Sequence, residues 1–302
     1  MLIALDWGTS SLRGYLLGDT GEILDRRHAD RGILKVADGA FATTCLEFCS
    51  GWGDLPAIAS GMIGSKQGWK EAPYIPAPAS LQQIAAGLVS VDISGHRPLK
   101  IVPGVSCRDR QGVPDVMRGE ETQLFGALAA LAAGEGAARS FVLPGTHSKW
   151  AVAGPGGIER FSTFMTGEVF AVLKAHSILG RLMPESGVVV ADEGFRKGAN
   201  AALHGGGGGL LHRLFSVRTL GLFDDVPADQ LASYMSGLLI GEEVFAARDS
   251  GLLNDAGSVG IVADAALADL YRAVLTMADV ASMVLPPDLA AAGLWQISRL
   301  AM

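Results

Sequence analysis

The start of the chain carries the feature that most limits its fold: a buried strand that ends in an acid and a tight turn of small residues. Residues 2–5 form an apolar run of strand length that leads into Asp6. Residues 12–17 read as a second strand, and residues 22–27 as a more polar third one. The small residues of the turn are Gly8, Thr9, Ser10 and Ser11. The pattern therefore predicts a β-hairpin at the start of the fold.

The turn of this hairpin has the chemistry of a phosphate site. A glycine lets backbone N–H groups approach an anion closely. The hydroxyls of Thr9, Ser10 and Ser11 can donate hydrogen bonds to phosphate oxygens, and Asp6 can hold a magnesium ion, usually through water. A plain hairpin with a structural cap is the alternative, and the local pattern does not separate the two.

A second turn of the same kind follows a strand predicted over residues 140–143. It reads Pro-Gly-Thr-His-Ser-Lys-Trp and leads into another strand over residues 151–153. Its candidate phosphate contacts are Gly145, Thr146, His147, Ser148 and Lys149. A lone histidine is more often structural than functional. Two such turns, one in each half of the chain, carry more information than either turn alone.

A glycine-rich loop follows a short strand predicted over residues 56–59. It reads SGMIGSKQGW over residues 60–69 and carries a cation and an indole. Open α/β sheets bind ligands at the carboxyl ends of their strands, so this loop is a candidate for substrate binding. A solvated connector is the alternative.

Two adjacent carboxylates, Glu120 and Glu121, open a helix that is predicted from the leucines at 124, 128 and 131. Acids are common in the first turn because the helix dipole favours negative charge there. The functional alternative is a general base presented at the start of the helix. Later in the chain, helical patterns cover residues 231–248 and 265–277, and glycine-rich breaks occur at 134–138 and 205–209.

Composition excludes several classes of protein. A formal net charge of −7 over 302 residues argues against a general nucleic-acid binder. The three cysteines make neither a disulfide framework nor a zinc spacing, which suits a reducing cytoplasm. We expect no signal peptide and no membrane span, because no apolar run is long enough to cross a bilayer. The chain also lacks a P-loop and a GxGxxG fingerprint, so a nucleotide site must be of another type.

Two phosphate hairpins in successive α/β halves resemble the actin-like ATPase and sugar-kinase superfamily. Longer motifs bring the resemblance to one family. DWGTSSLRGYLL, SGMIGSKQGW, PDVMRGEETQLFGAL, LPGTHSKW, FMTGEVFAVLKAHSIL and LLHRLFSVRTLGLF occur in the order typical of the 2-dehydro-3-deoxygalactonokinase family. RGEETQLFGAL and LPGTHSKW together are the most specific of these motifs.

The resemblance implies an α/β protein of two ribonuclease-H-like domains with ATP and substrate in an interdomain cleft. We place the domains at residues 1–115 and 116–302. The implied reaction is the ATP-dependent, magnesium-assisted phosphorylation of 2-dehydro-3-deoxy-D-galactonate at its terminal C6 hydroxyl. ATP and the sugar acid are thus the expected small-molecule partners of a cytoplasmic enzyme, with no nucleic acid or membrane. A homodimer is one alternative for the oligomeric state, which the sequence does not give.

The same resemblance assigns roles to residues. Asp6 and the turn at 8–11 are similar to the first phosphate motif of the superfamily, and residues 145–148 to the second. Glu120, with Glu121 beside it, stands in the context of the catalytic carboxylate, and the choice between them stays open. The substrate is an anion, so cations are expected near it. The expected substrate contacts are Arg13, Ser60, Gly61, Met62, Ser65, Lys66 and Arg118.

Two other functions stay open at the level of sequence. The first is a kinase of a related sugar acid, such as the gluconate epimer, because stereochemistry depends on side-chain positions within about an ångström. The second is a nucleotide-binding regulator or assembly protein on the same fold. A DNA-binding regulator needs a basic helix-turn-helix segment, and none stands out in this sequence.

Overall fold

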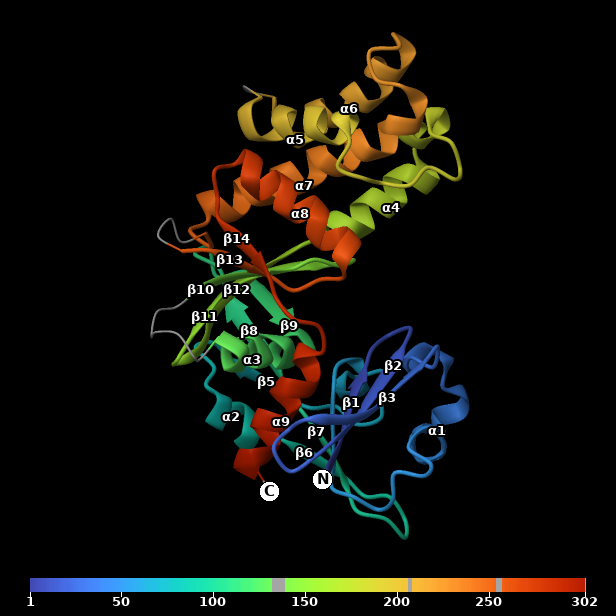
Figure 1. The fold of residues 1–302 in the computed structure, drawn as a ribbon, viewed down its shortest axis with the longest axis vertical. Coiled ribbons are helices and arrows are strands. Elements are labelled where there is room, and N and C mark those ends of the chain that lie inside the picture. Colours follow the sequence, from blue (N-terminus) through green and yellow to red (C-terminus); the bar gives the residue numbers. More distant parts are fainter. Residues whose placement is uncertain (132–138, 206–207, 254–256, 302) are drawn as a thin grey trace. The chain divides into compact units, whose positions relative to one another are not determined.

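The structure is a computed structural model that describes residues 1–131, 139–205, 208–253 and 257–301 (Figure 1). The described residues form two compact units. Unit 1 comprises residues 1–138, 153–160 and 288–302, and unit 2 comprises residues 139–152 and 161–287. The glycine-rich break predicted at 134–138 lies outside the described residues, as do two positions, 206 and 207, of the break at 205–209.

Unit 1 is built on a six-stranded sheet in the order β3-β2-β1-β4-β7-β6. Its strands are β1 (Leu2–Trp7), β2 (Leu12–Leu17), β3 (Ile23–Ala29), β4 (Ala57–Ser60), β6 (Val89–Val91) and β7 (Leu99–Ile101). β1 pairs with β2 as the predicted antiparallel hairpin and runs parallel to β4, with Asp6 opposite Ser60. Because parallel strands end at one edge of the sheet, the tips of β1 and β4 lie side by side.

A smaller sheet in unit 1 has the order β5-β8-β9. Its strands are β5 (Tyr74–Pro76), β8 (Gly104–Arg108) and β9 (Pro114–Met117). Pro114 stands at the first position of the edge strand β9. Its missing N–H group therefore removes no hydrogen bond from the interior of the sheet. The chain leaves this sheet at Met117 and passes through Arg118 and Gly119 into the helix α3 (Glu120–Leu131).

The helices of unit 1 are α1 (Phe41–Phe48), α2 (Leu81–Ala86), α3 (Glu120–Leu131) and α9 (Leu289–Ala301). α3 and α9 lie against each other at two glycines, although they are far apart in the sequence. A Cβ atom on Gly126 would lie 2.0 Å from the carbonyl oxygen of Leu289, and one on Gly293 would lie 1.8 Å from that of Thr122. Only glycine allows so close an approach. The domain boundary at 115 and 116 stays a prediction, and in the structure α3 groups with unit 1.

Unit 2 repeats the strand order of unit 1. Its five-stranded sheet, of which residues 153–160 group with unit 1, has the order β12-β11-β10-β13-β14. This order matches β3-β2-β1-β4-β7 position by position. The strands are β10 (Arg139–Leu143), β11 (Ser148–Gly154), β12 (Gly157–Phe164), β13 (Val259–Ile261) and β14 (Ser282–Val284). β13 runs parallel to both β10 and β14, as β4 does to β1 and β7. The prediction of two α/β halves of one kind is therefore confirmed.

The helices of unit 2 gather on one side of this sheet (Figure 1). They are α4 (Thr166–His176), α5 (Glu193–His204), α6 (Gly209–Leu222), α7 (Leu231–Asp249) and α8 (Ala265–Met277). α7 is buried on nearly all sides, which suits a helix that is apolar around its whole circumference. It packs closely on α5, where a Cβ atom on Gly237 would lie 2.0 Å from the carbonyl oxygen of Phe195. Among the described residues, no helix has the length and apolar character needed to cross a bilayer.

Candidate active site

The first Gly-Thr-Ser turn is held from its carbonyl side. The carbonyl oxygens of Gly8, Thr9 and Ser10 accept hydrogen bonds of 3.0, 3.3 and 3.0 Å from backbone N–H groups of residues 32–34. Gly32 lies so close that a Cβ atom there would be 2.2 Å from the carbonyl oxygen of Thr9. Gly32 was not predicted from the sequence, because a glycine after a polar strand is typical of an ordinary turn.

The amide side of the same turn is open. The N–H of Gly8 donates to the carbonyl oxygen of Ser11 at 2.9 Å, which closes the turn. No acceptor for the N–H groups of Thr9, Ser10 and Ser11 is present in the part of the chain that the structure describes. The side chains of Thr9 and Ser10 are exposed. Consecutive free amides beside free hydroxyls form a concave donor site that fits an anion.

Asp6 lies at the tip of β1 directly before this turn. Its side chain is 18% exposed, and one oxygen lies 3.6 Å from the guanidinium of Arg13. Burial raises the pKa of Asp6, and the positive charge of Arg13 opposes the rise. A partly exposed carboxylate beside an anion site fits a magnesium ion held through water. Among the described residues, no three His, Cys, Asp or Glu side chains cluster as a metal site.

The predicted substrate loop meets this edge of the sheet through Gly61. A Cβ atom on Gly61 would lie 2.9 Å from the carbonyl oxygen of Trp7 and 3.5 Å from an oxygen of Asp6. A Cβ atom on Gly119 would in turn lie 3.3 Å from the Cα of Gly61. Both glycines have positive φ angles, +90° and +110°. The tip of β1, the loop after β4 and the start of α3 therefore converge within unit 1.

Glu120 and Glu121 lie in the first turn of α3 and accept hydrogen bonds from the backbone just before it, but their surroundings differ. Glu121 is fully buried, and one oxygen accepts a hydrogen bond of 2.6 Å from the N–H of Gly119. Burial, together with the neighbouring charge of Glu120, raises the pKa of Glu121 to about 8. Glu120 is partly exposed and accepts a hydrogen bond of 3.0 Å from the N–H of Arg118. The two adjacent glutamates are thus distinct in chemistry.

The side chain of Arg118 lies beside these carboxylates. Its Nη2 donates to the carbonyl oxygen of Ala72 at 2.8 Å, and its guanidinium carbon lies 4.3 Å above the ring of Tyr74. The Nε and Nη1 atoms of Arg118 are buried without a hydrogen-bond partner among the described residues. The same is true of Ser65 Oγ and of Glu121 Oε1. Buried polar atoms are nearly always satisfied in proteins, so this set fits a polar ligand or ordered water.

The other predicted substrate contacts have varied surroundings. Ser60 is fully buried, and Thr122 donates a long hydrogen bond of 3.4 Å to its hydroxyl. Met62 is partly buried against the core of unit 1. Lys66 is exposed, and no hydrogen bond or ion pair joins it to another described residue. Arg13 is paired with Asp6.

The second Gly-Thr turn, in unit 2, is like the first in having a bonded carbonyl oxygen and free amides. The carbonyl oxygen of Thr146 accepts a hydrogen bond of 3.0 Å from the N–H of Glu168, at the start of α4. The described residues contain no acceptor for the N–H groups of Gly145, Thr146 and His147, which lie exposed at the tip. The imidazole of His147 is bonded to the carboxylate of Glu168. The tip is therefore anchored to α4 and presents free donors.

Ser148 and Lys149 follow the turn but are buried. The hydroxyl of Ser148 donates to Glu243 at 2.6 Å, and the ammonium of Lys149 donates to the hydroxyl of Thr163 at 2.7 Å. Both side chains are therefore hydrogen-bonded to other residues inside unit 2. Glu243 was not predicted as a site residue from the sequence. The available signal was a pair of acids at 242 and 243 inside an apolar helix.

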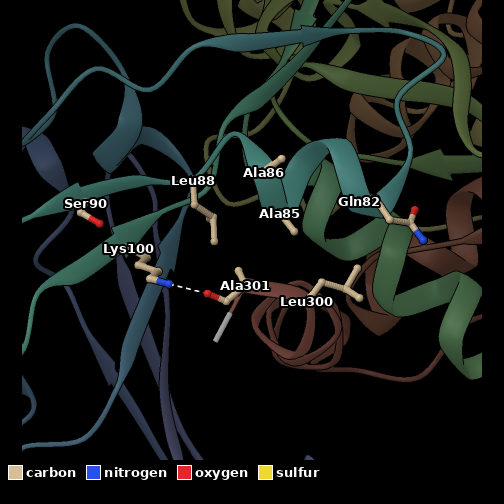
Figure 2. A pocket seen from close by; sticks show the side chains of 8 residues that line it. All are labelled: Gln82, Ala85, Ala86, Leu88, Ser90, Lys100, Leu300 and Ala301. Atoms are coloured by element: carbon tan, nitrogen blue, oxygen red, sulfur yellow. Dashed lines mark hydrogen bonds between the residues drawn. The ribbon is translucent and has the colours of Figure 1, made fainter.

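A separate cavity of about 410 Å³ lies at another place in unit 1 (Figure 2). It is bordered by α2, the strands β6 and β7, and the end of α9. Lys100 reaches across it and donates to the carbonyl oxygen of Ala301 at 2.6 Å. None of the predicted site residues lines this cavity. The converging residues, rather than the cavity, are therefore the candidate active site.

Comparison with known proteins identifies the family. The profile of the family described as 2-keto-3-deoxy-galactonokinase matches residues 6–297. The chain belongs to the 2-keto-3-deoxy-galactonokinase family. The match spans both Gly-Thr turns, the loop after β4 and the start of α3.

Relatives that carry the enzyme's name cover most of the chain. "Probable 2-dehydro-3-deoxygalactonokinase DgoK1" of Rhizobium meliloti (strain 1021) is 40% identical over 285 residues, 90% of this chain and 88% of the relative. The 2-dehydro-3-deoxygalactonokinase of Escherichia coli (strain K12) is 36% identical over 252 residues, 82% of this chain and 80% of the relative. Both identities are high enough to support membership of the same family.

Solved structures show the same fold. A crystal structure from Sinorhizobium meliloti that bears the same enzyme name has a TM-score of 0.86 at 37% identity and covers 99% of this chain and 98% of its own. A more distant structure is the activator of the 2-hydroxyisocaproyl-CoA dehydratase from Clostridium difficile with bound ADPNP. It has a TM-score of 0.51 at 11% identity and covers 99% of this chain and 95% of its own. The second likeness extends to the fold alone.

Proposed function

We propose that this chain transfers the γ-phosphoryl group of ATP to the C6 hydroxyl of 2-dehydro-3-deoxy-D-galactonate. The observation that carries the proposal is the match of the galactonokinase family to nearly the whole chain. The products are ADP and 2-dehydro-3-deoxy-6-phosphogalactonate. Because the proposed reaction consumes ATP, we propose that it takes place in the cytoplasm.

The two Gly-Thr turns are proposed to bind phosphate oxygens of ATP. Phosphoryl transfer depends mainly on positioning and on stabilisation of spread negative charge. The free N–H groups of residues 9–11 and 145–147 supply fixed donors for that charge. Because the carbonyl sides of both turns are already bonded to the protein, the donors need little rearrangement when the phosphates bind.

Magnesium is proposed to enter with the nucleotide. The carboxylate of Asp6 would hold the ion through water, beside the donors of the first turn. When bound, the ion neutralises charge on the phosphate oxygens. The guanidinium of Arg13, at 3.6 Å, helps to keep Asp6 in its charged form.

Glu120 is proposed as the general base. It would accept the proton of the C6 hydroxyl while the new O–P bond forms and the bond between the γ-phosphorus and its bridging oxygen breaks. Glu121 suits this task poorly, because it is fully buried and, with a pKa of about 8, already holds a proton at neutral pH. Its proposed role is to hold the start of α3 through the N–H of Gly119.

The carboxylate of the sugar acid is proposed to bind at Arg118. This guanidinium has two buried donor atoms without partners, and Ser65 Oγ is a further buried atom in the same condition. A buried cation is costly unless it is paired, so an anionic substrate relieves that cost. Lys66 and Arg13 stay secondary candidates, because Lys66 is exposed and Arg13 already faces Asp6.

A coupled ADP-release assay over a panel of sugar acids tests the proposal. We expect the highest kcat/KM for 2-dehydro-3-deoxy-D-galactonate. A preference for the gluconate epimer would change the proposed substrate but would still support the proposal of a sugar-acid kinase. Tight ATP binding with no sugar acid consumed would contradict the kinase proposal and favour a nucleotide-binding regulator.

A further inference from the structure

Glu243 of α7 is a buried acid that the mechanism above does not use. Its side chain is only 2% exposed, and its carboxylate accepts four hydrogen bonds. Ser148 Oγ and Trp150 Nε1 donate to one oxygen at 2.6 and 2.7 Å. The hydroxyl of Tyr271 donates to the other oxygen at 2.8 Å, and the hydroxyl of Thr166 donates to the same oxygen. Burial of an isolated carboxylate costs free energy. In Glu243 that cost is offset, because each carboxylate oxygen accepts two hydrogen bonds.

The donors to Glu243 belong to the segments that build the second Gly-Thr turn. Ser148 and Trp150 lie on β11, which leaves the turn, and Ser148 is the residue directly after it. Thr166 opens α4. Two residues later, Glu168 donates its N–H to the carbonyl oxygen of Thr146. One carboxylate therefore joins the exit of the turn to the helix start that holds its tip.

The spacing between these parts is tight. A Cβ atom on Gly167 would lie 2.4 Å from the carbonyl oxygen of Gly145 and 2.9 Å from the Cα of Thr146. A small displacement of the start of α4 would therefore move the turn or break its contact with α4. The hydrogen bond from Thr166 to Glu243 resists that displacement, and the one from Ser148 holds the opposite side.

We propose that Glu243 is a positioning residue for nucleotide phosphate binding: its carboxylate fixes Ser148 and Thr166, so that the N–H groups of residues 145–147 keep the geometry that a phosphate requires. The inference rests on the proposed function only in taking the bound anion to be a phosphate of ATP. The proposal also gives α7 a function, because this helix carries the carboxylate that fixes the geometry of the turn.

The test compares Glu243→Gln with Glu242→Gln. Glutamine keeps the size of Glu243, but its amide nitrogen cannot accept the hydrogen bonds that one carboxylate oxygen receives now. Glu242 is the matched control, because it is the preceding residue of the same helix, is also largely buried and pairs with Arg213, away from the turn. Binding of ATP is measured by calorimetry, and amide hydrogen exchange is measured by mass spectrometry. Steady-state kinetics gives the KM for ATP and for the sugar acid.

For Glu243→Gln we expect ATP to bind about tenfold more weakly, the loss expected when buried hydrogen bonds are disturbed. The KM for ATP should rise in parallel, with the KM for the sugar acid unchanged. The amide of Glu168, which donates to the carbonyl oxygen of Thr146, should exchange faster than in Glu242→Gln. Unchanged ATP affinity and exchange in a folded Glu243→Gln protein would overturn the proposal. An equal loss in Glu242→Gln would overturn it too, because the effect would then be general destabilisation.

Thr166→Val decides the question if Glu243→Gln does not fold. It removes one donor to the carboxylate and keeps the shape of the side chain. We expect a smaller loss of ATP affinity of about threefold, with faster exchange at the amide of Glu168. Wild-type affinity and exchange in this variant would then overturn the proposal. The affinity measurement needs no sugar acid, so a chain that binds ATP without kinase activity would contradict the proposed function and still decide the role of Glu243.

Discussion

Glu121 lies fully buried beside the partly exposed Glu120, and the charge of Glu120 helps to raise the pKa of Glu121 to about 8. The amino-acid sequence cannot separate two adjacent glutamates, because both are acids in the first turn of the same helix. Their surroundings do separate them. The pair therefore supports a division of roles, in which Glu120 reacts and Glu121 holds the backbone.

Replacement of Glu120 by Gln tests the proposed base. We expect kcat to fall by about 10² or more, the scale of a positioned general base, with the fold and ATP affinity retained. Glu193→Gln is the matched control, since Glu193 also stands in the first turn of a helix and is exposed. Near-wild-type turnover in Glu120→Gln would move the role to Glu121 or to another residue.

The pH dependence of stability tests the state of Glu121. The pKa of this group rises from 4.5 to about 8 on folding, so the folded chain holds an extra proton between these values. A rise in pH through this window therefore lowers the free energy of unfolding. Glutamine cannot ionise, so the Tm of Glu121→Gln relative to wild type should increase from about pH 5 to about pH 8 and then level off. The full effect is on the order of a few kcal/mol.

Thermal unfolding followed by circular dichroism at several pH values measures that difference. Glu193→Gln is the comparison, because it removes an exposed carboxylate from the first turn of another helix and leaves the charge of Glu120 in place. A Tm difference for Glu121→Gln that stays constant across the pH range would show that Glu121 is charged in the folded chain at neutral pH.

Local signals in the sequence predicted much of the fold. The two hairpins follow from short apolar runs bounded by small-residue turns, and both are present. The helix predicted over residues 265–277 matches α8 (Ala265–Met277), because Asp264 caps it by accepting a hydrogen bond of 3.0 Å from the N–H of Leu267. Such features depend on neighbours in the sequence, so a reading of the sequence can find them.

Features that depend on distant contacts were not predictable. No helix was predicted for the tail, where α9 lies. Gly293 within α9 weakens a helix by its intrinsic preference, and only its contact with α3 explains why it is there. Glu243 gains its importance from Ser148, 95 residues earlier in the chain. The roles that we propose for Gly32 and Glu243 can therefore be inferred only once the fold brings their partners together.

Substitutions of Arg118 and Lys66 test whether each residue binds the sugar acid. In Arg118→Lys, the compact ammonium cannot replace the planar guanidinium that lies over Tyr74 and donates to Ala72. We expect the KM for the sugar acid to rise about tenfold, with that for ATP nearly unchanged. Lys66→Ala is the second variant, and its sugar-acid KM should also rise more than its ATP KM. An unchanged constant would remove the corresponding residue from the site.

Gly32→Ala tests whether the backbone under the first turn sets its geometry. The added methyl group would lie 2.2 Å from the carbonyl oxygen of Thr9 and would push the turn away from residues 32–34. We expect a rise in the KM for ATP of about tenfold and a loss of stability of about 1–3 kcal/mol, the usual cost of overpacking. Gly156→Ala is the control, because a Cβ atom there meets nothing within 4 Å. An ATP KM equal to that of the control would show that the first turn keeps its function without the support of Gly32.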